Sequence, residues 1–202
     1  MSDGENDEEN ANKVIFIGDS GVGKTNLIRV STGQKFEPAK LSTTHVSSIT
    51  KKVLYNKKAH IFNLWDTIGQ EKYKSITRLF YRNSKIVLYI CDITNKGSFI
   101  ALEKWIEDVE KEIGKDYVMA IVGNKKDLFL QEEVAEEEAK QYAETKNCKF
   151  KLASAKEESL LFIEFLNSLF IDYLNQIEGN DIKERETLSI KSDNKENQRK
   201  CC

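Results

Sequence analysis

The sequence predicts an α/β fold: a six-stranded, mostly parallel sheet with one antiparallel edge strand and five flanking helices. Uninterrupted apolar runs at 86–90 and 118–122 are typical of central parallel strands covered on both faces. Strand-like and helix-like segments alternate through the body of the chain, which favours helices on both faces of the sheet. The strand-like segments 46–55 and 59–65 are close neighbours in the sequence and form the expected antiparallel hairpin.

The six expected strands follow from local patterns, taken in chain order. The first alternates and is rich in β-branched and aromatic residues, and Asn56-Lys57-Lys58 is the turn of the hairpin. The expected strands lie near 13–18, 46–55, 59–65, 85–91, 117–123 and 149–153. Ligands of such sheets bind at the carboxyl ends of the strands, so residues that follow a strand are the candidates for function.

The five expected helices lie near 24–32, 71–82, 98–113, 132–146 and 158–176. The third carries one apolar stripe, formed by Phe99, Leu102, Ile106, Val109 and Ile113. Ser98 precedes this stripe and is a suitable residue to cap the helix. These helices complete the expected α/β arrangement.

The chain divides into one globular body, residues 12–177, between two polar arms. Residues 1–11 are acidic and are expected to be disordered, and residues 178–202 form an expected flexible tail. A net charge of −2 gives no basis for nucleic-acid binding. No apolar run approaches the ~18 residues of a membrane span, and the acidic N-terminus lacks the features of a signal peptide. We therefore expect a cytosolic protein.

The most informative motif is Gly18-x-x-x-x-Gly23-Lys24-Thr25, which follows the first strand and opens the first helix. Its glycines allow backbone N–H groups to surround phosphate oxygens, and the helix directs its positive dipole end at the same anions. Lys24 can reach the terminal phosphates, and the Thr25 hydroxyl can bind Mg²⁺. The alternative is a plain glycine-rich turn.

A second motif, Asp66-Thr67-Ile68-Gly69-Gln70, follows the third strand. Asp66 can hold Mg²⁺ through water, and the N–H of Gly69 can approach a γ-phosphate closely. The amide of Gln70 both donates and accepts, so it can orient an attacking water. Taken alone, these residues also fit an ordinary turn.

Two further motifs favour guanine as the base. Asn124-Lys125-Lys126-Asp127 follows the fifth strand, and the carboxylate of Asp127 can accept hydrogen bonds from both the ring N–H and the exocyclic amine of guanine. The stem of Lys125 can pack over the purine, and Asn124 can tie its loop to the phosphate loop. Backbone N–H groups of Ser154-Ala155-Lys156, after the last strand, can donate to the guanine oxygen.

With these motifs in order, the chain resembles the Rab branch of the Ras superfamily of small GTPases over residues 12–177. The similar stretches are GDSGVGKT at 18–25, WDTIGQEKYKSI at 65–76, LFYRNS at 79–84, YICDIT at 89–94 and GNKKDL at 123–128. The resemblance implies the G-domain form of the P-loop NTPase fold, with Mg²⁺ and GTP or GDP as ligands. It also implies slow GTP hydrolysis and a switch between two nucleotide-bound shapes.

The resemblance also assigns roles to individual residues. Phe36 stands where the family packs an aromatic residue on the guanine edge, and Thr43 matches the switch threonine that reaches Mg²⁺ in the GTP state; Ser42 and Thr44 flank it, so this assignment can slip by one residue. The implied nucleotide contacts are Ser20, Gly21, Val22, Gly23, Lys24, Thr25, Asn26, Phe36, Thr43, Gly69, Asn124, Lys125, Asp127, Ser154, Ala155 and Lys156. The implied metal ligands are Thr25, Thr43 and Asp66, and the implied catalytic residues are Gln70, Lys24 and Thr43.

The chain departs from the family around the switch segments. Thr44 and His45 stand where the family has an apolar residue and then Gly, Ser48 replaces an aromatic residue, and Ile68 replaces Ala. These changes motivate an alternative from another class, a catalytically impaired pseudo-GTPase that acts as a membrane-tethered adaptor. A phosphate-loop ATPase or kinase is a further alternative, against which Asp127 argues because it favours guanine.

The chain ends in Cys201-Cys202, which resembles the double-cysteine end that Rab proteins use for two geranylgeranyl groups. The alternatives are exposed thiols or a vicinal disulfide. Two lipid chains give stable anchoring, so the resemblance implies a place on the cytoplasmic face of an intracellular membrane. It also implies a monomer with a cytosolic pool. The implied partners are GTP-state effectors, an exchange factor, a GTPase-activating protein, and factors for prenylation and membrane extraction.

Overall fold

The computed structural model describes residues 11–38, 47–67 and 80–199 of the 202-residue chain, with side chains up to Gly179. Its six strands form one sheet in the order β2-β3-β1-β4-β5-β6. The strands are β1 (Asn12–Ile17), β2 (Ser47–Tyr55), β3 (Lys58–Asp66), β4 (Ser84–Asp92), β5 (Val118–Asn124) and β6 (Lys149–Leu152). Only β2 pairs antiparallel with its neighbour among these strands. The predicted mostly parallel sheet with one antiparallel edge strand is confirmed.

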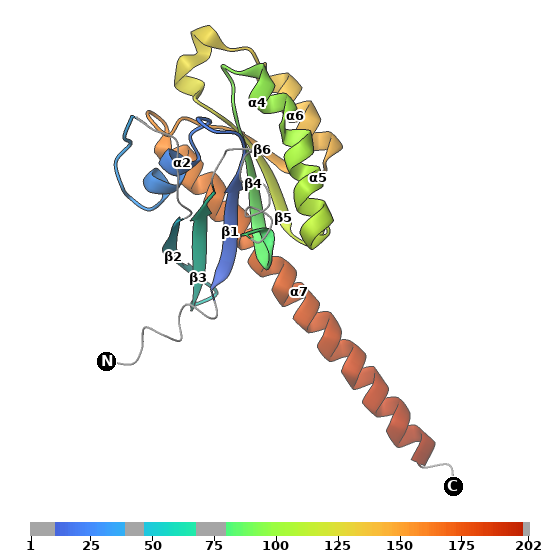
Figure 1. Ribbon diagram of the computed structural model, residues 1–202. Coiled ribbons are helices and arrows are strands. Elements are labelled where there is room, and N and C mark those ends of the chain that lie inside the picture. Colours follow the sequence, from blue (N-terminus) through green and yellow to red (C-terminus); the bar gives the residue numbers. More distant parts are fainter. Residues whose placement is uncertain (1–10, 39–46, 68–79, 200–202) are drawn as a thin grey trace.

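Helices cover both faces of the sheet (Figure 1). The α-helices within the described ranges are α2 (Lys24–Ser31), α4 (Lys96–Ile100), α5 (Leu102–Ile113), α6 (Glu136–Thr145) and α7 (Ser159–Arg199). A short 3₁₀ helix, η2 (Lys126–Gln131), follows β5. Helices α2 and α7 pack against one face, while α5 and α6 lie against the other. No described helix has both the length and the apolar character needed to cross a bilayer.

The two faces of the sheet form two separate hydrophobic cores because successive side chains of a strand point in opposite directions. In β1, Val14 and Phe16 are buried in the core beneath α2 and α7, whereas Ile15 and Ile17 are buried in the core beneath α5. Burial on both faces explains why the central strands are uninterrupted apolar runs. Between them, the two cores fix the carboxyl ends of the parallel strands at one edge.

The hairpin between β2 and β3 closes through a two-residue turn, with Tyr55 paired to Lys58. Asn56 and Lys57 both have positive φ, of 48° and 62°. This backbone is the one that matches the twist of a two-residue hairpin, and Asn adopts it readily. The tripeptide predicted as the turn is thus shortened by one residue, since Lys58 already belongs to β3.

Two helices begin at other residues than the patterns predicted. The segment expected as one helix over 98–113 consists of α4 and α5, and α4 begins two residues earlier than expected. The carboxamide of Asn95, rather than Ser98, caps α4 and accepts from the backbone N–H of Ser98. The expected helix at 132–146 begins only at Glu136, because the N–H groups of Glu133 and Val134 bond to Ile93 instead.

The last helix does not end near residue 176, as the sequence analysis expected, but continues to Arg199. Residues 178–199 contain one glycine and no proline, so nothing in their composition stops a helix. That residues 178–202 act as a flexible tail, and residues 1–11 as a disordered arm, stay predictions. Most of the expected helix at 71–82 lies outside the described residues; Phe80 and Tyr81 are helical.

Candidate functional site

The candidate site lies where the carboxyl ends of β1, β3, β4 and β5 meet. The loop after β1 closes on the first turn of α2, and its glycines are required by close contacts. A Cβ on Gly18 would lie 2.1 Å from the carbonyl oxygen of Ile90 in β4. A Cβ on Gly23, which has a φ of 97°, would lie 2.3 Å from Nδ2 of Asn124 at the end of β5. Only glycine fits at these positions, so the loop is packed against two strand ends.

Lys24 is the buried cation of this loop. Its side chain folds back so that Nζ donates to the carbonyl oxygens of Gly18 and Asp19, each at 2.8 Å. An ammonium group has three donors, so, as far as the described residues show, one remains for an anion. Burial lowers the pKa of Lys24 from its ordinary 10.5 to about 8, although the carboxylates of Asp66 and Asp19 act to raise it. A phosphate would satisfy both the remaining donor and the desolvated charge.

Thr25 and Asp66 form a pair of hard oxygen donors beside Lys24. The hydroxyl of Thr25 donates to Oδ2 of Asp66 at 2.6 Å. Asp66 is only 3% exposed, and its Oδ1 has no hydrogen-bond partner among the described residues. Burial raises the pKa of Asp66, which the hydrogen bond from Thr25 and the charge of Lys24 oppose. Oxygen ligands of this kind suit Mg²⁺, so the two residues fit the predicted metal site.

Asp127, which is predicted to recognise the base, is held in place by residues of the loop after β6. Its Oδ1 accepts from the Ser154 hydroxyl at 2.6 Å, and Nζ of Lys156 lies 3.8 Å from Oδ2. The buried oxygen of Ser154 also accepts from the backbone N–H groups of Lys156 and Glu157. Each partner restricts the position of the carboxylate, so Asp127 is preorganised to accept hydrogen bonds from a base.

Asn124 joins the two halves of the site: the base half, which contains Asp127, and the phosphate half, which contains Lys24. Its side-chain Nδ2 donates to the backbone carbonyl of Val22 in the phosphate loop at 2.8 Å, and the residue is 2% exposed. The expected tie between Asn124 and the phosphate loop is therefore confirmed. Because Gly23 lies against the same side chain, the end of β5 sets the position of the whole loop.

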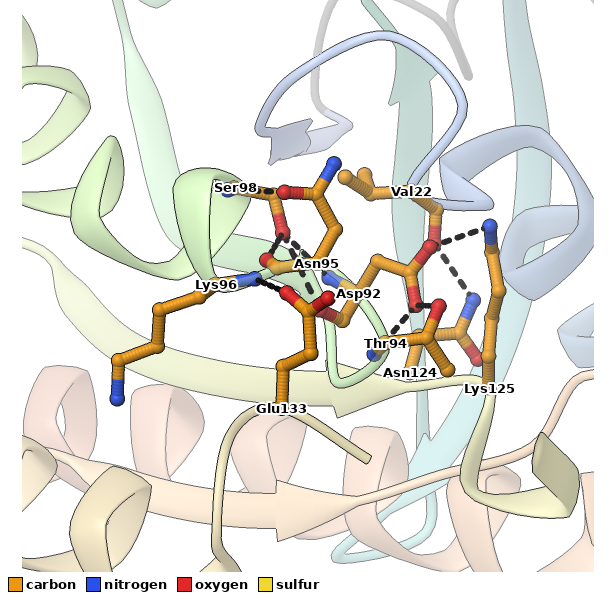
Figure 2. A network of polar contacts seen from close by, with 9 residues as sticks. All are labelled: Val22, Asp92, Thr94, Asn95, Lys96, Ser98, Asn124, Lys125 and Glu133. Carbon is orange, nitrogen blue, oxygen red and sulfur yellow. Dashed lines mark hydrogen bonds and ion pairs between the residues drawn. The ribbon is translucent and has the colours of Figure 1, made fainter. Parts of the chain in front are cut away.

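A polar network around Asp92 supports Lys125, and local patterns gave no sign of it. Nζ of Lys125 lies 2.5 Å from Oδ2 of Asp92, at the end of β4 (Figure 2). Oδ1 of the same carboxylate accepts from the backbone N–H and the hydroxyl of Thr94, at 3.0 and 2.7 Å. The backbone N–H of Asp92 donates to Ser98 of α4. The ion pair with Asp92 thus fixes the ammonium group of Lys125, whose backbone has a φ of 68°.

Asn26 and Phe36 hold the beginning of the segment that follows α2. The carboxamide of Asn26 bonds the backbone of Glu37 twice, donating to its carbonyl at 2.7 Å and accepting from its N–H at 3.1 Å. Arg29 adds an ion pair to Glu37 at 2.7 Å. Phe36 is half-buried and packs against the core beneath α2 and α7. A direct contact of Asn26 or Phe36 with a nucleotide stays a prediction, while their role in holding this segment is visible.

The remaining predicted residues fall into two groups. Ser20 and Gly21 are exposed at the tip of the phosphate loop, Val22 is buried within it, and Ala155 is buried next to Ser154. Thr43, Gly69, Gln70, Cys201 and Cys202 lie outside the described residues. Thr67, which had no predicted role, donates from its hydroxyl to the carbonyl of Phe16 at 2.5 Å and so fixes the end of β3 against β1.

Comparisons with known proteins agree with this arrangement. A family model described as the Ras family matches residues 13–178. Ras-related protein Rab-11B of Dictyostelium discoideum is 40% identical over 158 residues, which cover 78% of this chain and 71% of that protein. Ras-related protein Rab-22A of Homo sapiens is 34% identical over 169 residues and 84% of each chain. Ras-related protein Rab-30 of Homo sapiens is 34% identical over 160 residues, which are 79% of this chain and 76% of that protein.

Proposed function

This chain belongs to the Ras family as a Rab-like small GTPase, and we propose that it is a molecular switch that binds GTP and GDP with Mg²⁺ and slowly hydrolyses GTP. The observation that carries the proposal is the hydrogen bond from Asn124 to Val22. It joins the loop after β5, which we assign to the base, to the loop after β1, which we assign to the phosphates, at the same edge of the sheet. A nucleotide is the ligand that has a base at one end and phosphates at the other.

The phosphate end would be bound by backbone N–H groups of residues 20–26 and by the ammonium of Lys24. Thr25 and Asp66 would hold Mg²⁺, which, when bound, neutralises charge that develops on the phosphates. Lys24 is already desolvated and directed by two carbonyls, so it need not be reorganised when a phosphate arrives. These contacts would hold the triphosphate in position for attack by water.

The base end would select guanine. The carboxylate of Asp127 accepts from both N–H groups that guanine presents on its Watson–Crick edge, and adenine has no such pair of donors. The network of Asp92 keeps Lys125 beside the place of the purine, where the stem of the lysine can cover its face. A base without these two donors would leave the carboxylate of Asp127, whose side chain is 8% exposed, without hydrogen bonds on the side that faces the base, which is costly.

The switch itself would depend on residues outside the described ranges. Thr43 and Gly69 would contact Mg²⁺ and the γ-phosphate in the GTP state only, and Gln70 would orient the attacking water. We expect an unaided hydrolysis rate on the order of 10⁻⁴ s⁻¹, like that of Ras itself, and a much faster rate with an activating protein. Hydrolysis would release the segments around residues 38–48 and 66–82 from their GTP-state positions.

The biological role that fits such a switch is the regulation of vesicle traffic. The GTP state would bind effectors, and an exchange factor and a GTPase-activating protein would reset it. Geranylgeranyl groups on Cys201 and Cys202 would anchor the protein to the cytoplasmic face of an intracellular membrane. Prenylation and membrane-extraction factors would maintain a cytosolic pool.

The test is to purify the protein, denature it, and identify the released nucleotide by chromatography, with single-turnover hydrolysis measured on reloaded protein. Released GDP and a measurable, Mg²⁺-dependent turnover are the expected results. Released GTP with no turnover would overturn the proposed hydrolysis and leave an adaptor. No nucleotide, together with no uptake of GTP in the presence of Mg²⁺, would overturn nucleotide binding as well.

A further inference from the structure

Trp105 connects α5 to the phosphate loop across the sheet edge. The residue lies in the core beneath α5 and α6 and is only 5% exposed. Its indole Nε1–H donates to the side-chain Oδ1 of Asp19 at 2.8 Å. An indole nitrogen can only donate, so a buried tryptophan in this position needs an acceptor, and the acceptor here is a carboxylate of the nucleotide loop.

Asp19 is an unusual neighbour for a phosphate site because its charge has the same sign as the ligand. Its backbone carbonyl accepts a hydrogen bond from Nζ of Lys24, while its carboxylate is bonded to Trp105 instead. Asp19 therefore contacts Lys24 through its main chain and Trp105 of α5 through its side chain, while the charge of its carboxylate still acts to raise the pKa of Lys24. An ammonium and a carboxylate attract each other strongly where water is scarce, so Lys24 is the natural competitor for this carboxylate.

We propose that Trp105 is a positioning residue of the phosphate site, whose indole N–H holds the carboxylate of Asp19 away from Lys24 and leaves the ammonium available to phosphate oxygens. The proposal rests on the proposed nucleotide-binding function. The packing of α5 against β4 supports it, because this packing fixes the buried indole ring relative to the sheet. A charged acceptor also makes the bond stronger than one between neutral groups.

The experiment is a double-mutant cycle on the dissociation rate of GDP, with Trp105→Phe, Asp19→Ala and the double variant. Loss of a hydrogen bond to a charged group corresponds to about a tenfold change or more. We expect Trp105→Phe to speed GDP release about tenfold when Asp19 is present, because the freed carboxylate competes for Lys24. In the Asp19→Ala background the same substitution should change the rate less than twofold.

Tyr142→Phe is the matched control. It removes a hydroxyl of α6 that donates to the carboxylate of Glu103 in α5 at 2.7 Å, a contact that involves no residue of the phosphate loop. This variant should lose a comparable hydrogen bond and leave GDP release unchanged. The indole N–H resonance of Trp105, one of only two tryptophans in the chain, reports the bond directly and should shift in Asp19→Ala.

The outcomes separate this inference from the function on which it rests. Wild-type protein that fails to bind GDP would defeat the proposed function. Wild-type protein that binds GDP, with a Trp105→Phe effect that is equally large in both backgrounds, would show that the ring acts by packing alone and would overturn the positioning role. An indole resonance that is insensitive to Asp19→Ala would overturn the hydrogen bond itself.

Discussion

The two halves of the site differ in how completely their charged groups are paired. In the base half, formed by the loops after β5 and β6, Asp127 is paired with Ser154, and Asp92 with Lys125. The buried Oδ1 of Asn124, where the two halves meet, has no hydrogen-bond partner among the described residues. In the phosphate half, burial lowers the pKa of Lys24 and raises that of Asp66, and one oxygen of Asp66 has no partner among the described residues. The charged groups of the base half thus stabilise the nucleotide-free fold. Those of the phosphate half lower its stability and remain available to bind a ligand.

This difference predicts how substitutions will behave. Changes in the base half should lower nucleotide affinity and the stability of the nucleotide-free protein together, because the same contacts serve both. Changes in the phosphate half should lower affinity without lowering stability, because the charged groups there are costly until a ligand pairs with them. Four measurements can break or sharpen this distinction.

Lys24→Met should have the largest effect. Affinity for GDP should fall at least about 30-fold, because loss of one partner of a buried charge pair costs about 2–5 kcal/mol. The free energy of unfolding of the nucleotide-free protein should stay within about 1 kcal/mol of wild type, since removal of a desolvated charge offsets the lost hydrogen bonds to two carbonyls. Calorimetry and urea unfolding measure the two quantities. Lys111→Met, at an exposed ion pair on α5, is the control and should change neither; a large loss of stability in Lys24→Met would contradict the distinction.

Asp66→Asn should come next. The increase in GDP affinity that Mg²⁺ provides should fall about tenfold to a hundredfold, as for other groups that hold a metal through water. Nucleotide-free protein should gain stability at neutral pH, because burial raises the pKa of Asp66 and a neutral amide avoids that penalty. Titration of Mg²⁺ at fixed GDP measures the first effect. Asp172→Asn, at a surface pair with Lys149, should leave the Mg²⁺ dependence intact; equal responses of the two variants would refute the assignment of Asp66.

The pH dependence should have opposite signs for binding and for stability. The folded-state pKa of Lys24 is about 8, below the ordinary 10.5. Between these values the unfolded chain binds the proton more than the folded chain does, so stability rises with pH in this window. GDP binding needs the charged ammonium, so affinity should fall by up to about tenfold per pH unit above pH 8. Lys24→Met should remove both slopes, and parallel slopes for binding and stability in the wild type would contradict the assignment.

Ser154→Ala should have the smallest effect and the same sign in both measurements. Loss of the hydroxyl frees Asp127 and leaves two backbone N–H groups without their acceptor, which should cost about 1–2 kcal/mol of stability. GDP affinity should fall severalfold as well. Ser168→Ala on α7, whose hydroxyl donates only within the helix to Phe165, is the control for loss of a serine hydroxyl. A variant with weaker GDP binding and unchanged stability would place Ser154 with the phosphate half.

Local sequence patterns were sufficient for the sheet and for the parts of the site that lie within one loop. Apolar runs located β4 and β5 because both faces of each strand are buried, and Gly18, Gly23 and Lys24 were recognisable from spacing alone. Contacts between distant segments could not be read in this way. Asp92 meets Lys125 because the parallel strands β4 and β5 end at the same edge. Trp105 meets Asp19 because α5 lies beside the loop after β1. A carboxylate or an indole has no local signal for such a partner.

The ends of the helices were the least predictable feature, because they depend on contacts with residues outside the helix. Asn95 and Ser98 are both good caps, and the choice between them was decided by the backbone N–H of Asp92, which uses the hydroxyl of Ser98. In α7, the apolar pattern fades after residue 177 while the helical backbone continues, because a helix requires suitable residues but not a buried face. Burial patterns therefore locate the packed part of a helix and not its length.

Helix α7 is joined to the hairpin of β2 and β3 near the end of its packed part. The contacts of this helix that lie furthest along the chain, within the described side chains, join Asn175 to Tyr55 at 2.5 Å and Glu178 to Asn56 at 3.1 Å. Both partners belong to the hairpin of β2 and β3. Arg199 lies some twenty residues beyond, roughly 30 Å further along the helix. A displacement of the packed part of α7 would therefore reach this hairpin, and with it the strand at the edge of the sheet.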